Sequence, residues 1–142
     1  GKGSNYLITT DRHDSYGILC HNQRKLGYIY YLTKEDELEK ESLWKYFEDR
    51  DSLELHLELD DLPNGKYQIK AYRINIQNGN LMNIWKEMDY EKELSRNDVK
   101  YFRRMCEPKL SIRKQEVTDG KLNLDVKMQY NEIAFIRVRK LA

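Results

Sequence analysis

Three histidines and two cysteines are the side chains in this sequence that could ligate a metal ion or act as nucleophiles. Cys20 and His21 are adjacent, so on a strand they would point to opposite faces, and His56 falls on the polar face of an alternating run. His13 lies in a separate polar cluster. None of these residues, nor Cys106, has the spacing of a zinc site. We therefore predict no metal site and no cofactor site.

Short motifs that accompany common enzyme chemistry are also missing from the sequence. It contains no G-x-S-x-G nucleophile elbow, no G-x-G-x-x-G dinucleotide fingerprint and no phosphate loop. The acidic stretch from Lys34 to Glu41 includes lysines and lacks the glycine turn that calcium loops need, so we interpret it as a solvated face. We predict that the chain holds no catalytic residue.

The charge balance argues against a protein that binds nucleic acid through its overall field. The sequence has 25 basic and 24 acidic residues and a formal net charge of +1. Two small basic clusters are present, and no recognisable helix-turn-helix partner precedes the first. We interpret both as solvated faces. The clusters are Lys100, Arg103 and Arg104, and Arg137, Arg139 and Lys140.

Cysteine usage and hydropathy favour a cytoplasmic protein without a membrane partner. Two widely separated cysteines form no disulfide framework, which fits a reducing compartment. No window approaches the roughly 18 apolar residues of a membrane span. Residues 1–4 look like a cloning remnant, and residues 5–142 are expected to form a single domain of a longer protein.

Aromatic residues, 11 of them tyrosine, offer a further binding chemistry, because exposed rings can stack on sugars. Tyr28, Tyr30 and Tyr31 form the best candidate for a surface aromatic patch. Tyr72 and Trp85 occupy core positions of their predicted elements and are expected to pack. Direct sugar binding by exposed tyrosines is one hypothesis for this chain.

A turn at Pro63-Asn64-Gly65 organises the predicted strands. Proline presets a negative φ, while asparagine and glycine tolerate left-handed geometry. Residues 53–60 before the turn alternate apolar and polar side chains, as a strand with one buried face requires. After the turn, apolar side chains occupy both parities, which indicates an interior strand. The pattern predicts a β-hairpin across this turn.

Two helices are predicted from their capping residues. Asn80 is the expected N-cap of a short helix that carries Leu81, Ile84, Trp85 and Met88 on one face.

Ser95 and Asp98 form a capping box for the second helix, which Pro108 ends. Its predicted buried stripe contains Val99, Phe102 and Cys106.

The remaining segments are mainly β-prone. A hairpin is expected between residues 6–10 and 16–20, a second at Thr118-Asp119-Gly120, and a central strand at 133–138. Residues 27–32 are expected to form a strand or a packed loop. Residues 34–47 are expected to form either a helix, with a weak capping box at Thr33 and Asp36, or a long excursion. Together these segments predict a mainly β protein, an antiparallel two-sheet β-sandwich with one or two short helices.

Four pieces of the sequence, in their order, resemble a known domain. They are Leu62-Pro63-x-Gly65, Tyr67, Tyr72-Arg73-Ile74 and Trp85-Lys86-Glu87-Met88. This order is similar to the small C-terminal β-sandwich of glycoside hydrolase family 39. The catalytic glutamates of that family belong to an upstream barrel, so none can be assigned here. The resemblance implies that Tyr72, Arg73 and Trp85 are framework or domain-docking residues.

Residues 94–104, followed by Pro108-Lys109-Leu110, are similar to the version of this domain at the C-terminus of long AraC-type transcriptional regulators. That resemblance implies a non-catalytic domain that supports a family-39-like barrel, in a sensor or assembly role. Promoter DNA would be bound only by a helix-turn-helix region outside these residues, and a homo-oligomer is left open. The alternative is the accessory β-sandwich of a cytosolic β-xylosidase of family 39.

Overall fold

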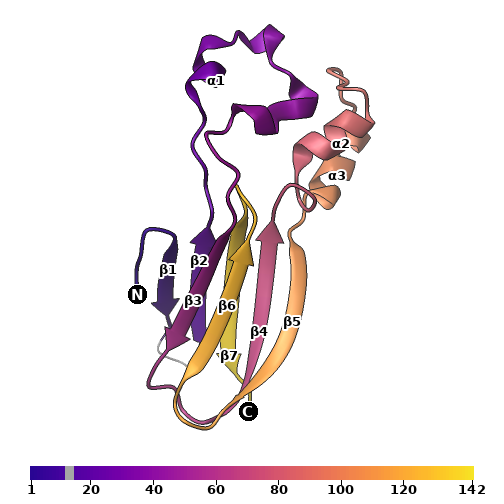
Figure 1. Cartoon of the computed structure of the whole chain (residues 1–142). Helices are drawn as coiled ribbons and strands as arrows, with labels where there is room; N and C mark the ends of the chain where they lie inside the picture. The colour runs from indigo at the N-terminus through magenta and orange to yellow at the C-terminus, as the bar shows by residue number, and fades with distance from the viewer. Residues whose placement is uncertain (12–14) are drawn as a thin grey trace.

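Two antiparallel sheets form the body of the molecule, in a computed structural model that describes residues 1–11 and 15–142 (Figure 1). One sheet has five strands in the order β1-β2-β7-β4-β5, and the other pairs β3 with β6. The strands are β1 (Tyr6–Thr10), β2 (Ser15–His21), β3 (Leu53–Leu59), β4 (Gly65–Ile74), β5 (Lys109–Val117), β6 (Leu122–Met128) and β7 (Ile133–Lys140). The predicted two-sheet sandwich is confirmed.

The hydrophobic core lies between the two sheets. Alternating apolar side chains of β3 and β6 form the inner face of the small sheet, and this alternation is typical of strands with one wet face. They cover β2, β7 and the first half of β4, where Tyr67 is fully buried. The core side chains include Ile18, Cys20, Leu57, Leu59, Ile69, Leu122, Leu124, Val126, Met128, Ala134, Ile136 and Val138.

Three strand predictions are confirmed by the pairing. β1 and β2 form an antiparallel hairpin. β7 is the central strand of the large sheet, between β2 and β4. β4 is an interior strand, between β7 and β5.

The two predicted hairpins at Pro63-Asn64-Gly65 and Thr118-Asp119-Gly120 are wrong. β3 pairs with β6, whereas β4 pairs with β5 and β7, so both turns carry the chain from one sheet to the other. The buried Leu62 lies in the first connection, and its N–H donates to the carbonyl of Gly120 in the second. Strands of facing sheets are about 10 Å apart instead of 4.8 Å, so a longer crossing replaces a tight turn.

Helical segments gather beyond one end of the sandwich (Figure 1). Between β2 and β3 the chain makes an excursion with one α-helix and two 3₁₀ helices, and two α-helices separate β4 from β5. The segments are α1 (Tyr28–Leu32), η1 (Glu35–Glu37), η2 (Lys40–Tyr46), α2 (Leu81–Glu87) and α3 (Arg96–Met105). More helices are therefore present in the described residues than the one or two predicted.

The excursion differs from both predictions made for its first part. Residues 28–32 form a helical turn, neither a strand nor a loop. In this turn Tyr30 packs against Tyr46, and this tertiary contact overrides the β propensity of the aromatic run. The capping box at Thr33 and Asp36 is absent, because Lys34 precedes η1 and provides no side-chain cap.

The other two caps are confirmed. The Asn80 side chain accepts a hydrogen bond from the Met82 N–H at the start of α2. At the start of α3, Ser95 and Asp98 exchange both hydrogen bonds of a capping box. The predicted stripe of α3 is only partly buried, since Phe102 is buried whereas Val99 is exposed.

We expect Ser95→Ala to lower the free energy of unfolding by about 1 kcal/mol, because the N–H of Asp98 loses its side-chain acceptor. The same hydroxyl lowers the pKa of the Asp98 carboxyl. Separately from the N–H cap, the carboxylate's own contribution is present above the unfolded-state pKa and is lost as pH falls through the lowered folded-state pKa. Urea denaturation at pH 7 measures the effect, with the exposed Ser52→Ala as control; equal midpoints for the two variants would contradict the role of the cap.

Candidate docking surface

The outer face of the five-stranded sheet carries a line of apolar side chains in register. Leu7 pairs with Leu19, Leu19 with Phe135, Phe135 with Tyr72, and Tyr72 with Leu110. One side chain from each of the five strands therefore stands in a single row across the sheet, which we call the apolar row. Exposed fractions of the four aliphatic and phenyl side chains range from 42% to 47%. In the part of the chain that the structure describes, neither the small sheet, which packs on the other face, nor a helix covers them.

Three isoleucines widen the apolar row along the strands. Ile133 and Ile74 pair one step further along β7 and β4, and Ile112 lies two residues after Leu110 on β5. They are 49%, 38% and 54% exposed, respectively. A contiguous exposed apolar patch with polar margins is typical of a protein interaction site.

Basic side chains border this patch toward the end of the sheet away from the helices. Arg137 and Lys70 pair directly across β7 and β4, and Arg139 pairs with Gln68. All lie on the same outer face, because they alternate with buried residues in their strands. The arrangement resembles an interface with an apolar centre and a charged rim.

The three residues predicted for domain docking lie in different places. Tyr72 belongs to the apolar row, and its ring lies 6.3 Å from that of Phe135. Trp85 is half-buried on α2, where its Nε1–H donates to the carbonyl of Glu91 and Lys40 lies over the ring. Arg73 points to the inner side of the sheet. A docking role for these residues stays a prediction, with Tyr72 the one on the apolar row.

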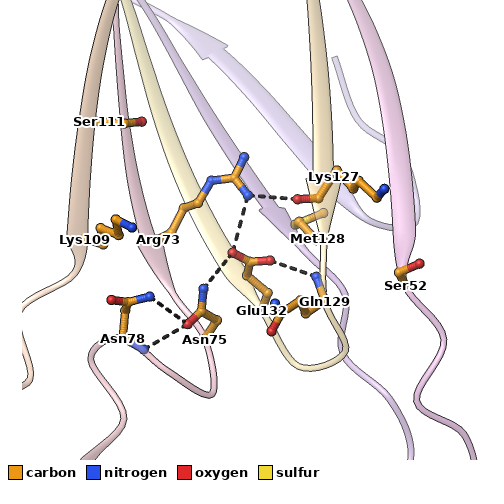
Figure 2. Close-up of a pocket in the computed structure, with 10 residues that line it drawn as sticks. All are labelled: Ser52, Arg73, Asn75, Asn78, Lys109, Ser111, Lys127, Met128, Gln129 and Glu132. Atoms are coloured by element: carbon orange, nitrogen blue, oxygen red, sulfur yellow. Dashed lines mark hydrogen bonds and ion pairs between the residues drawn. The ribbon is translucent and has the colours of Figure 1, made fainter.

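Arg73 belongs to a hydrogen-bonded cluster at the end of the sandwich (Figure 2). Its Nη1 donates to the carbonyl of Lys127 over 2.8 Å and to the carboxylate of Glu132 over 3.4 Å. Glu132 is 2% exposed and also accepts from the Asn75 amide and the Gln129 N–H. The cluster joins β4 to the turn between β6 and β7.

The predicted aromatic patch is divided by the structure. Tyr28 and Tyr31 are 74% and 72% exposed. Tyr30 is half-buried and packs edge-on against Tyr31 and Tyr46, with ring centroids 5.4 and 6.0 Å apart. Sugar binding by the exposed pair stays a prediction.

Histidines and cysteines do not converge in the part of the chain that the structure describes. No group of three or more potential metal ligands occurs there, and His13 lies outside the described residues. Cys20 is buried, and burial raises the pKa of its thiol against the lowering effect of Arg73. His56 is exposed on β3, where its Nδ1 lies 2.6 Å from the carboxylate of Asp125.

The Asp125 carboxylate raises the pKa of His56, first through this hydrogen bond and then through its charge. The stabilisation is therefore complete below the unfolded-state pKa and is lost as pH rises through the higher folded-state pKa. NMR titration should place the His56 transition above its ordinary value and move it down in Asp125→Asn. A transition that Asp125→Asn leaves in place would show that the carboxylate does not act on the imidazole.

Comparisons with known proteins connect the chain to two groups. No family model matches the sequence. A Staphylococcus aureus (strain N315) uncharacterized HTH-type transcriptional regulator is 33% identical over 86 residues, which is 61% of this chain and 11% of the relative. The equivalent protein of strain MRSA252 is 34% identical over the same shares. The chain thus spans about a tenth of the length of these curated relatives.

Solved structures share the fold at low identity. A monomeric β-xylosidase from Caulobacter crescentus CB15 matches 99% of this chain and 27% of its own, with a TM-score of 0.70 and 15% identity. The GH39 enzyme from Xanthomonas axonopodis pv. citri matches 99% and 26%, with a TM-score of 0.69 and 15% identity. The described part of the chain has no helix long and apolar enough to cross a bilayer.

Proposed function

We propose that this chain is a non-catalytic domain of a cytoplasmic AraC-type transcriptional regulator. It supports a family-39-like barrel of the same polypeptide, in a sensor or assembly role, and contacts that barrel through the apolar row. Promoter DNA is bound by a helix-turn-helix region outside these residues. The observation that carries the proposal is the apolar row, because burying apolar side chains away from water is favourable, so a second domain that covers this row is stabilised on it.

The comparisons support this choice of parent protein. The relatives with the higher identity are named as HTH-type regulators, and most of each relative lies outside the matched segment. Such a polypeptide has ample surface to cover the outer face of the large sheet. The enzymes that share the fold are likewise about four times longer than the part that this chain matches.

Phe135→Asp tests the docking surface within the longer polypeptide. After the connection to this domain is cut with a site-specific protease, the unmodified fragments should stay associated, whereas the variant should weaken their association by about a hundredfold, because a carboxylate would be buried in an apolar interface. Analytical ultracentrifugation measures this association.

Leu32→Asp is the matched control, since Leu32 is 78% exposed but lies on α1 outside the apolar row. Thermal unfolding of both variant domains should resemble that of the unmodified chain. Association that survives Phe135→Asp, or that Leu32→Asp weakens equally, would reject the surface.

The second candidate is the accessory domain of a β-xylosidase of family 39, which the shared fold favours. The same surface would then cover a catalytic barrel. Two barrel glutamates at strand ends and xylosidase activity of the longer protein would support the enzyme, whereas sequence-specific binding of promoter DNA would support the regulator.

A further inference from the structure

A cleft of about 460 Å³ opens beside the Arg73 cluster, on the side of the large sheet opposite the apolar row (Figure 2). Residues at the ends of β4 and β5 and in the turn between β6 and β7 line it. β5 is an edge strand, and residues 109–114 are exposed on both of its faces. The register places Lys109 opposite Arg73 and Ser111 opposite Ala71, so both β5 side chains share the inner face with Arg73.

The Arg73 guanidinium has an unused edge in this cleft. Its described hydrogen bonds all involve Nη1, which donates to Lys127 and Glu132. Among the described residues, Nε and Nη2 have no hydrogen-bond partner. The side chain is 30% exposed and lines the cleft, so a ligand there can reach the guanidinium. Parallel N–H groups on one edge of a guanidinium match the two oxygens of a carboxylate.

The charges that line the cleft select a monoanion. Arg73 and Lys109 are the cations whose side chains share its inner face, and Glu132 is the acid among the lining residues. The Lys127 side chain is on the opposite face of β6, and only its backbone reaches Arg73. One positive charge therefore remains after Glu132 is counted, and a single carboxylate neutralises it.

We propose that this cleft is a carboxylate-binding site. Nε and Nη2 of Arg73 hold the two oxygens, while the Lys109 ammonium and the Ser111 hydroxyl complete the contacts. The cleft volume suits a molecule of the size of a sugar acid. The carboxylate comes either from such a small organic acid or from an aspartate or glutamate side chain of another domain in the longer polypeptide. This site is separate from the apolar row and does not depend on the function proposed above.

The ¹H–¹⁵N signal of the Arg73 Nε–H group tests the site in the 142-residue chain. Sodium glucuronate and sodium acetate should shift this signal and the Ser111 amide, with a dissociation constant on the order of 1 mM for glucuronate. Glucose, and sodium chloride at equal ionic strength, should leave both signals in place. If sodium chloride shifted the signals as much as glucuronate does, ionic screening alone would explain the shifts and the proposal would be overturned.

Lys109→Ala should weaken glucuronate binding by about tenfold, because it removes a charged contact. Lys114→Ala is the matched control, since Lys114 is also exposed on β5 but faces the outer side of the sheet. Neither substitution touches the buried Glu132 pair, so both variants should fold. Identical affinities for the two variants would overturn the assignment of Lys109 and the cleft.

The longer polypeptide distinguishes the two sources of the carboxylate. If a side chain of another domain supplies it, the Arg73 signal already has its ligand-bound position and glucuronate adds no shift. If a free acid supplies it, the signal titrates as in the isolated chain. A signal that stays at its unbound position and does not respond to glucuronate would contradict the proposal.

Discussion

Tyr67→Ala is expected to lower the free energy of unfolding by about 4 kcal/mol, the largest effect of a single substitution that we predict. Tyr67 is fully buried between the sheets, so the truncation leaves a cavity that neighbouring strands can fill only in part. Its hydroxyl also donates to the carbonyl of Pro63, within the connection that crosses from β3 to β4. Chemical denaturation measures the loss.

Tyr67→Phe separates the ring from the hydroxyl. This variant keeps the packing and loses the hydrogen bond to Pro63, so it should cost about 1 kcal/mol. The difference between the two substitutions then reports the ring alone. If Tyr67→Ala cost no more than Tyr67→Phe, the ring would not be part of the core.

Arg73→Met is expected to lower the free energy of unfolding by about 3 kcal/mol, because it removes the cation beside a buried carboxylate. Glu132 is 3% exposed in its side chain and retains the hydrogen bonds from Asn75 and Gln129. These remaining bonds place the expected cost at the low end for a broken buried pair. Urea denaturation of the single variants gives the measurement.

The double variant Arg73→Met with Glu132→Gln provides the control for charge. With both charges removed, much of the stability should return, since no uncompensated carboxylate stays buried. A double variant as unstable as the sum of its single variants would show that the two residues act independently.

Strand positions could be predicted from the sequence because two segments alternate between apolar and polar residues and the others are β-prone runs bounded by turn residues. Which strands pair could not. The inner faces of β3 and β4 look alike whether the two strands adjoin in one sheet or face each other across the core. Only tertiary information, such as the burial of Leu62 in the connection, distinguishes a crossing from a hairpin. The two wrong hairpins have this common cause.

The apolar row shows a similar limit for the site. The sequence marked residues 133–138 as apolar on both parities, which we attributed to a central strand, and the strand is central. Its outer parity, with Ile133 and Phe135, is nevertheless exposed. Apolar residues on both faces predict that each face is covered, whereas the structure covers only the inner face of this strand. Leu7 and Leu110 lie in one row only because of the register of all five strands, which the sequence alone does not reveal.

Crossing connections also determine how the chain folds. β7 is the last strand in the sequence, yet it pairs with β2 near the beginning, so that Ser15 lies opposite Arg139. β6 likewise finds its partner in β3, beyond an intervening strand pair and two helices. Such distant pairings lose chain entropy when the long loops close, before the strand contacts can compensate for it. This slows folding to the millisecond-to-second range. We therefore expect the sandwich to assemble slowly, once its central strand is in place.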